Sequence, residues 1–320
     1  MTYRVHGLLL ASDLPLPELE TEPEAPGLRP PDVRIGLAVA PLPPQGRQIM
    51  SWALAGGEEW LSCAAADGGY LLRFPGLAEV FVDAAGTRIL ARAEPGTAGG
   101  TLRHLLLDQV LPLVLNLLGR DALHATAVLI PGGVCAFTGP AGAGKSTLAA
   151  SFLEAGHPVV SDDCLALTAE AGRILAWPAY PGVRLWEDTV ATLGVTGGRH
   201  GAVAHYTSKR RLTPDGRGPK FPSGPQPLAR VYALVHPEGA AAATGTAPPR
   251  PERLQGREAV MELVKNTFRL DIGDGAMLAR QLHFLTGVAE RVPVARLRLP
   301  CSFAALPAVR EAILADLAQG

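Results

Sequence analysis

Short apolar or alternating runs dominate the first 95 residues of the chain. The runs at 33–39, 70–74 and 78–93 have the length and period of strands, and prolines or glycines lie between them. The tripeptide 84–86 suits a hairpin link within the last run. The pattern predicts a mostly β N-terminal domain over residues 1–95.

A different pattern begins after the Gly- and Pro-rich linker at 94–100. Residues 102–118 have helical spacing, and Pro112 should kink that helix because it lacks a backbone N–H. Apolar runs follow at 122–130 and 134–139, separated by a Pro-Gly-Gly turn. The two runs are typical of buried strands.

The next segments give the order strand, loop, helix, strand. Glycines follow residue 138, residues 146–156 have helical spacing, and 158–163 is a short apolar strand that ends in two aspartates. This βαβ order is typical of a nucleotide-binding α/β core, which we expect to occupy residues 96–320. Further elements of this domain are expected at 228–236, 256–270, 275–289, 294–300 and 303–319.

The region from 196 to 227 has no regular pattern. Glycines, prolines and basic residues dominate it. A loop of this length within a compact domain is usually functional or disordered, so we expect a mobile basic loop here.

Charge and composition exclude several classes of protein. The 29 basic and 30 acidic residues give a net charge of −1, which argues against a nucleic-acid-binding protein. The charge-free stretch 122–144 is broken by prolines and glycines, which do not suit a membrane-spanning helix. No export signal is visible at the N-terminus. We therefore expect a cytoplasmic protein that binds neither nucleic acid nor membrane.

One segment carries a phosphate-binding motif, G-x-x-x-x-G-K-[ST]. Its glycines let successive backbone N–H groups and a helix N-terminus face phosphate oxygens. Lys145 would reach the β- and γ-phosphates, and the Ser146 hydroxyl would bind Mg²⁺, so the cofactors expected are ATP and Mg²⁺. The motif, called here the phosphate loop, consists of Gly139, Pro140, Ala141, Gly142, Ala143, Gly144, Lys145, Ser146 and Thr147.

Asp162 and Asp163 end the apolar strand that follows the phosphate loop and its helix. Parallel neighbouring strands would bring both carboxylates to the sheet edge where the phosphates bind. One carboxylate could hold Mg²⁺ and the other could accept a proton from an attacking hydroxyl. The alternative is a pair of capping aspartates at a strand exit. His124, which precedes the first strand of this core, fits a packed or surface histidine at least as well as a catalytic one.

The sequence LHATAV…FTGPAGAGKSTLAASFLEAGHPVVSDD resembles the catalytic core of the HPr kinase/phosphorylase family. The segments YRVHGLLLASDLPLPEL, WPAYPGVRLWED and SKRRL are most similar to the HPr-kinase-related proteins of lasso-peptide biosynthesis clusters. The resemblance implies an α/β fold, with an HPr-kinase/PEP-carboxykinase-like P-loop core beside the mostly β N-terminal domain.

The resemblance also implies roles for individual residues. Asp162 would be the proton-accepting base, Asp163 a metal-side carboxylate, and His124 a neighbour that orients Asp162. Glu187 or Asp188 falls where the family has a further acidic residue near the metal.

Lys209, Arg210 and Arg211 would belong to the basic loop that closes over the transferring phosphate, with Arg210 as its catalytic member. The plainer interpretation of these three residues is a solvated charged loop. Two residues depart from the family pattern, Ala125 after the histidine and Ser161 before the aspartates. The segment that the bifunctional family uses for HPr binding and phosphorylase work is not found, which argues against both. An HPr-type protein kinase stays an alternative, and the sequence leaves open whether reverse (phosphorylase) activity exists.

Together these features predict an ATP-dependent kinase that transfers the γ-phosphate to a serine hydroxyl, on a ribosomally made precursor peptide or another small protein. A kinase or carboxykinase-like enzyme for a small molecule is one alternative. A nucleotide-dependent regulatory module with little catalysis is another. The sequence leaves open the acceptor, the preference for ATP over GTP, and whether the chain forms a homo-oligomer.

Overall fold

The computed structural model describes residues 1–23, 29–53, 56–193, 199–202, 209–213, 221–235, 249–300 and 302–319. The chain divides into two compact units. The described residues of unit 1 fall in Met1–Arg120 and Phe268–Arg280, and those of unit 2 fall in 121–267 and Gln281–Gly320. Unit 1 therefore continues past the boundary expected at residue 95.

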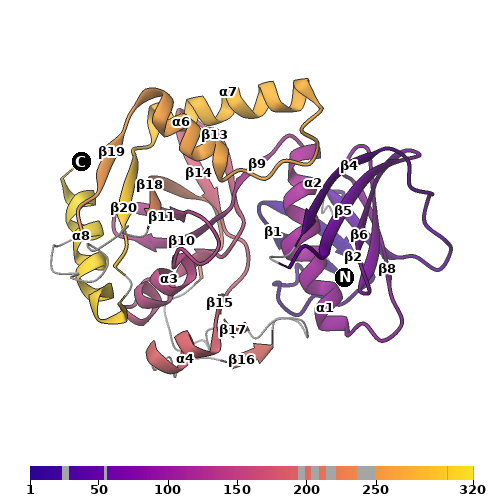
Figure 1. Cartoon of the computed structure of the whole chain (residues 1–320), viewed down its shortest axis with the longest axis horizontal. Helices are drawn as coiled ribbons and strands as arrows, with labels where there is room; N and C mark the ends of the chain where they lie inside the picture. The colour runs from indigo at the N-terminus through magenta and orange to yellow at the C-terminus, as the bar shows by residue number, and fades with distance from the viewer. Residues whose placement is uncertain are drawn as a thin grey trace. The chain divides into compact units, whose positions relative to one another are not determined.

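Unit 1 contains an eight-stranded sheet with the strand order β1-β2-β3-β8-β7-β6-β5-β4 (Figure 1). The expected β-rich character is present, and the structure adds strands at the N-terminus and at 48–66. The strands are β1 (Thr2–Val5), β2 (Leu8–Ser12), β3 (Val33–Leu37), β4 (Gln48–Ala53), β5 (Glu59–Ala66), β6 (Gly69–Phe74), β7 (Ala78–Asp83) and β8 (Arg88–Ala93).

A helical segment packs on this sheet, and it explains why unit 1 extends to Arg120. It consists of α1 (Gly99–Leu105), a π-helical turn η1 (Leu106–Val110) and α2 (Leu111–Leu117). A Cβ added at Gly86, in the β7–β8 turn, would lie 2.8 Å from the Cβ of Leu117, so the helix and the hairpin are in close contact. The irregularity expected at Pro112 takes the form of the π turn just before it, with Pro112 in the first turn of α2, where its missing N–H is tolerated.

Unit 2 is built on a nine-stranded mixed sheet, whose main path is β12-β10-β11-β18-β14-β13-β9, with β20 beside β18 and β19 beside β20. A small sheet has the order β15-β17-β16. The strands are β9 (Asp121–Leu123), β10 (Ala125–Ile130), β11 (Gly133–Thr138), β12 (Val159–Ser161), β13 (Leu165–Glu170), β14 (Arg173–Trp177), β15 (Val183–Leu185), β16 (Arg199–Ala202), β17 (Arg210–Thr213), β18 (Gln226–Val235), β19 (Glu252–Leu254) and β20 (Val294–Arg298). The helical elements are α3 (Lys145–Glu154), α4 (Glu187–Leu193), α6 (Gly256–Lys265), η2 (Phe303–Ala305) and α8 (Leu306–Ala318), together with the part of α7 (Gly275–Arg291) from Gln281 onward.

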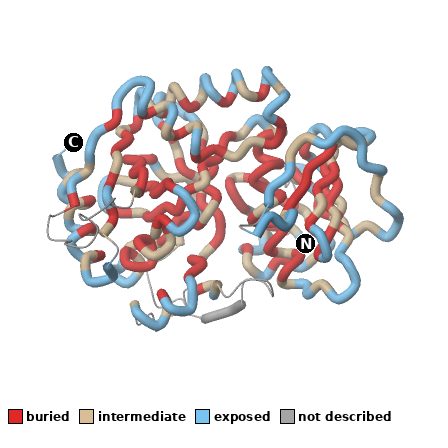
Figure 2. The backbone as a smooth tube through the Cα atoms, viewed as in Figure 1, coloured by how far each residue is buried: buried red, intermediate tan, exposed pale blue. Residues whose placement is uncertain are grey.

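Helices cover both faces of the large sheet, which gives unit 2 three layers. Along β11, Ala136 belongs to the core shared with α6 and with α7 from Gln281 onward, whereas Phe137 belongs to the core shared with α3 and α8. Successive strand residues point to opposite faces, so a strand buried on both sides is apolar throughout. Figure 2 shows the buried residues along the central strands of this unit. The expectation of a mixed α/β fold is confirmed.

The structure corrects the expected relation between the phosphate-loop strand and the aspartate strand. β11 and β12 are not neighbours, because β10 lies between them and pairs antiparallel with both. Two strands that are each antiparallel to the same strand run in the same direction. Their carboxyl ends therefore still meet at one edge of the sheet, and the Pro-Gly-Gly turn that joins β10 to β11 produces this arrangement.

Other differences concern element lengths. The helix expected at 256–270 ends at Lys265. The next residue, Asn266, caps the helix, and its side-chain oxygen accepts a hydrogen bond from the Gly139 N–H outside the helix. The segment expected to be irregular contains β16 and β17, paired antiparallel with each other. No helix in the described part of the chain is long and apolar enough to cross a membrane.

Candidate active site

The phosphate loop connects the end of β11 to the first turn of α3, as the motif predicts. Gly139, Gly142 and Gly144 have φ values of 140°, 82° and 88°, which side chains with a Cβ rarely adopt. A Cβ at Gly144 would also lie 2.6 Å from the Leu299 Cδ2 atom. The backbone conformation therefore requires glycine at the last loop position before α3, and a Cβ there would also force the Leu299 side chain to shift.

Lys145 is buried at the start of α3 and turns back over the loop. Its ammonium donates hydrogen bonds to the Gly139 carbonyl at 2.7 Å and to the Pro140 carbonyl at 3.1 Å. Burial lowers the pKa of Lys145, and the nearby carboxylates of Asp163 and Asp162 oppose that shift. The ammonium is thus held above the loop, where a phosphate oxygen could replace the two carbonyls as its partner.

Asp162 lies directly after β12 and is tied to the phosphate loop. Its Oδ1 accepts hydrogen bonds from the Ser146 hydroxyl at 3.0 Å and from the Thr126 hydroxyl at 2.8 Å. Its Oδ2 accepts one from the backbone N–H of Arg184 at 2.8 Å. Only 4% of the Asp162 side chain is exposed, so its oxygens are occupied by protein donors on all sides.

Asp163 is the more accessible of the two aspartates, with 29% of its side chain exposed. Its φ of 72° is a left-handed conformation that aspartate tolerates better than most residues. Burial alone would raise the pKa of Asp163. The Arg184 guanidinium, 3.0 Å from its carboxylate, and the His124 ring outweigh that effect and hold the pKa well below its usual range.

Arg184 joins the two aspartates, and sequence reasoning did not single it out. Its guanidinium donates to the Asp162 carbonyl at 2.8 Å and pairs with both carboxylates, while its side chain is only 4% exposed. Arg184 is the middle residue of β15, between Val183 and Leu185, which pack against α3. The sequence did contain a sign of this role. Arg184 is a charged residue between two apolar strand residues, and a charged side chain buried there needs a partner of opposite charge.

His124 is beside Asp163 rather than Asp162. Its Nε2 lies 3.7 Å from the Asp163 Oδ1 atom. The backbone N–H of His124 donates to the Asn266 carbonyl at 2.6 Å, and the Asn266 side-chain oxygen accepts from the Gly139 N–H at 3.1 Å. Asn266, which sequence reasoning also missed, therefore links the start of the phosphate loop to the segment that carries His124.

An apolar cavity of about 130 Å³ opens beside the phosphate loop. Thr147 of α3 and the aromatic ring of Phe303 belong to its lining, and Phe303 is exposed. The remaining lining residues are Gly144, Leu299, Pro300, Ser302 and Leu306. A flat apolar group next to the phosphates could occupy this space.

Of the basic residues at 209–211, Lys209 lies close enough to the aspartates to affect them, whereas Arg210 pairs with another residue. Lys209 lies over the Trp186 ring at 5.2 Å, and its charge lowers the pKa of Asp163 and of Lys145. Arg210 instead forms an ion pair with Glu187 at 2.8 Å, and both side chains are exposed. Asp188 accepts the N–H of Thr189 at the start of α4.

The predicted site residues thus fall into two groups. The structure brings together the phosphate loop, Asp162, Asp163 and His124. The second group is Glu187 and Arg210, which pair with each other. The described residues contain no group of three or more His, Cys, Asp or Glu side chains arranged for a metal. The metal role of Glu187 and the catalytic role of Arg210 stay predictions. Much of the basic loop at 196–227, including Arg217 and Lys220, lies outside the described residues.

Among known proteins, similarity to this chain is found with solved structures. No protein-family model matches the chain, and no curated protein matches its sequence. The solved structure of the Hpr(Ser) kinase/phosphatase from Coxiella burnetii is similar at 14% identity with a TM-score of 0.35, over 62% of this chain and 91% of that chain.

Proposed function

We propose that this protein is a Mg²⁺- and ATP-dependent phosphotransferase that acts on a hydroxyl group. The observation that carries the proposal is the hydrogen bond between Ser146 of the phosphate loop and Asp162 at the end of β12. A loop hydroxyl and a strand-end carboxylate in contact are the pair that holds Mg²⁺ beside the phosphates in P-loop enzymes.

The donor groups suit both cofactors. Gly139, Gly142 and Gly144 give the loop the positive φ values that a phosphate-binding turn of backbone N–H groups needs, and Lys145 adds a positive charge. Oxygen ligands are available from Ser146 and Asp162, and Mg²⁺ commonly takes only one or two protein carboxylates with water and phosphate oxygens. When bound, the metal would neutralise phosphate charge. The apolar cavity at Thr147 and Phe303 is where we place the nucleobase.

The contacts favour a division of roles opposite to the one that the family resemblance implies. Asp162 is enclosed and already bonded to Ser146, which suits the metal side. Asp163 is 29% exposed, and its pairing with Arg184 and His124 keeps the carboxylate ionised, so an acceptor can reach it and we assign it as the base that takes the hydroxyl proton. Lys145 would stabilise charge on the transferring group, and Arg184 would hold both aspartates in position.

The acceptor we propose is a serine hydroxyl of a ribosomally made precursor peptide, in the cytoplasm. This assignment rests on the sequence resemblance to the kinases of lasso-peptide clusters. We propose that Lys209 and Arg210, which lie on the segment leading into and along β17, approach the transferring phosphate once both substrates are bound.

The test is incubation of the full chain with Mg²⁺, γ-labelled ATP and the precursor peptide encoded next to its gene. We expect label on the peptide, and mass mapping should place one phosphoryl group on a serine. A peptide with that serine replaced by alanine and the Lys145→Ala protein are the two controls, and both should remain unlabelled. Label on a small-molecule hydroxyl but never on the peptide would retain the phosphotransferase and reject the peptide acceptor. ATP turnover absent with every hydroxyl acceptor would reject the proposal itself.

A further inference from the structure

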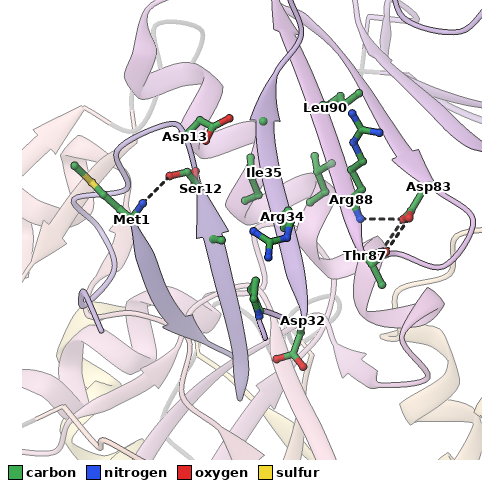
Figure 3. Close-up of a pocket in the computed structure, with 14 residues that line it drawn as sticks. Met1, Ser12, Asp13, Asp32, Arg34, Ile35, Asp83, Thr87, Arg88 and Leu90 are labelled. Carbon is green, nitrogen blue, oxygen red and sulfur yellow. Dashed lines mark hydrogen bonds between the residues drawn. The ribbon is translucent and has the colours of Figure 1, made fainter. Parts of the chain in front are cut away.

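Unit 1 contains a hollow on the outward face of its sheet, away from the phosphate loop in sequence and formed by unit 1 alone. Its volume is about 640 Å³, which lies in the range of small-molecule sites. Figure 3 shows the side chains that surround it, from β2, β3, β8 and the turns beside them. The lining residues are Met1, Ala11, Ser12, Asp13, Pro31, Asp32, Arg34, Ile35, Gly36, Asp83, Thr87, Arg88, Ile89 and Leu90.

Two arginines stand side by side in this hollow. Arg34 of β3 and Arg88 of β8 are directly paired in the parallel register of the two strands, so their Cα atoms are about 4.8 Å apart. Both are exposed, and neither guanidinium forms an ion pair or side-chain hydrogen bond with any residue that the structure describes. Like charges opposite each other on neighbouring strands are destabilising. The pair therefore carries an uncompensated charge that a bound anion would neutralise.

Two of the three carboxylates that line the hollow, Asp32 and Asp83, do not supply that neutralisation. Asp83 accepts hydrogen bonds from the backbone N–H groups of Thr87 and Arg88 and from the Thr87 hydroxyl, at 2.7–2.9 Å, and so fixes the turn before β8. Asp32 accepts the Leu9 N–H at 2.7 Å and both terminal nitrogens of Arg29 at 2.6 and 2.9 Å. Each of these carboxylates is already used to build the walls of the hollow.

The middle of the hollow is small, with an apolar floor and the Asp13 carboxylate at one side. Gly36 and Leu90 are the next outward-facing pair along the same two strands. A Cβ at Gly36 would lie 3.2 Å from the Leu90 Cδ2 atom and 3.5 Å from the Asp13 Oδ2 atom, so any larger residue would fill the space between them. Ala11 of β2 is paired with Arg34 and extends this floor on the other side. The site thus combines two adjacent cations with a short apolar surface.

We propose that this hollow binds a ligand with two carboxylates joined by a short hydrocarbon spacer. Guanidinium groups match carboxylates in a planar, two-bond geometry, and two neighbouring guanidiniums can each take one carboxylate. The spacer would lie on Leu90 and Ala11. The two carboxylates belong either to a free dicarboxylate or to neighbouring acidic side chains of a peptide, which share this chemistry.

The test is titration calorimetry on the full chain at low salt, with succinate, glutarate and a tetrapeptide that contains two adjacent glutamates. Propionate tests whether one carboxylate is enough, and inorganic phosphate tests whether any anion binds. We expect at least one two-carboxylate probe to bind about tenfold or more tightly than propionate and phosphate. Binding of succinate or glutarate would identify a free dicarboxylate as the source, and binding of the tetrapeptide alone would identify an acidic segment.

The variants Arg34→Gln and Arg88→Gln connect that binding to the hollow. Each should weaken it about tenfold, and the double variant should abolish it. Arg257→Gln removes one positive charge from the exposed side of helix α6 in unit 2 and should leave the affinity unchanged. Thermal unfolding should show that the two pocket variants are folded, since they remove like-charge repulsion. Binding that is unaffected by Arg34 and Arg88, phosphate bound as tightly as the dicarboxylates, or no binding of any two-carboxylate probe would each overturn the proposal.

Discussion

The hydroxyl of Ser146 donates a hydrogen bond to the Asp162 carboxylate across 3.0 Å, joining the first turn of α3 to the end of β12. Asp163, the next residue, makes no such contact and faces Arg184 and His124 instead. Two adjacent aspartates therefore have different surroundings, and their removal should have different consequences.

Isosteric replacement of each aspartate should separate their roles. Asp162→Asn is expected to raise the Mg²⁺ concentration needed for half-maximal activity, because the carboxylate beside Ser146 loses its charge. Asp163→Asn is expected to lower kcat about 10²-fold or more, as for loss of a general base, with nucleotide affinity retained. Initial rates over a Mg²⁺ series and fluorescent-nucleotide binding measure both quantities.

The opposite result would restore the roles implied by the family resemblance. In that case Asp162→Asn would abolish transfer at every Mg²⁺ concentration, and Asp163→Asn would shift only the metal requirement. Glu187→Gln is a useful third variant, because Glu187 is exposed and paired with Arg210. A shift in its metal requirement would support the further acidic ligand predicted from sequence.

Arg184 should matter for both stability and activity. Arg184→Met removes the guanidinium that is shared by Asp162 and Asp163 and leaves two carboxylates close together in a mostly buried site. Breaking a buried pair from one side costs about 3–5 kcal/mol, so a clear fall in the denaturation midpoint is expected. Arg184→Lys keeps the charge but loses the two-pronged geometry, and it should recover much of the stability while leaving kcat reduced.

Chemical denaturation and steady-state rates of the two Arg184 variants test this prediction. If Arg184→Lys restored activity as fully as stability, the charge alone would suffice and the geometry of the guanidinium would be unimportant. If Arg184→Met were as stable as the parent protein, the buried ion pairs would not hold the site together.

The parts of the site that could be predicted from the sequence are formed by residues that are neighbours along the chain. The phosphate loop is recognisable because glycines with positive φ, a lysine and a hydroxyl residue must follow one another without interruption. Asp162 and Asp163 were found because they end an apolar strand. The insertion of β10 between β11 and β12 was missed, since strand order depends on pairing partners rather than on local pattern.

The sequence pattern did not identify the site residues that come from distant segments of the chain. Arg184 lies on a strand of three residues, in a stretch with little helical or strand periodicity. Asn266 lies just after the end of α6. Neither belongs to a motif of its own. The hollow at Arg34 and Arg88 was likewise invisible, because only the parallel register of β3 and β8 places the two arginines together.

Gly144→Ala should damage the phosphate loop through both conformation and packing. Alanine would be strained at φ 88°, and its Cβ would lie 2.6 Å from Leu299. The two effects together should lower the free energy of unfolding by about 1–3 kcal/mol and weaken nucleotide binding. Gly224→Ala is the matched control, since a Cβ there meets nothing within 4 Å. Equal unfolding midpoints for the two variants would contradict the packing argument.

His6 should make unit 1 sensitive to acid. Burial lowers the pKa of His6 to about 4 from 6.5, with the Asp108 charge opposing the shift and Arg120 assisting it. Because the folded-state pKa is below the unfolded-state value, the unfolded chain takes up the proton first as the pH falls. The folded state should therefore lose stability progressively between pH 6.5 and pH 4, by about 3 kcal/mol from this residue, and lose no more from it below pH 4.

Urea denaturation of the parent protein and of His6→Asn over pH 7 to 4 tests this. Asparagine tolerates the φ of 53° at position 6, so the variant should fold, with a lower stability at pH 7 and a flatter dependence on pH. The exposed His283, changed to asparagine, controls for the loss of a histidine as such and should leave the pH dependence of the parent unchanged. Parallel pH curves for the parent protein and His6→Asn would show that His6 is not the group that titrates. A flatter curve for His6→Asn alone would locate the acid sensitivity in the β1–β2 turn, where the Nδ1 atom of His6 is buried with no hydrogen-bond partner among the described residues.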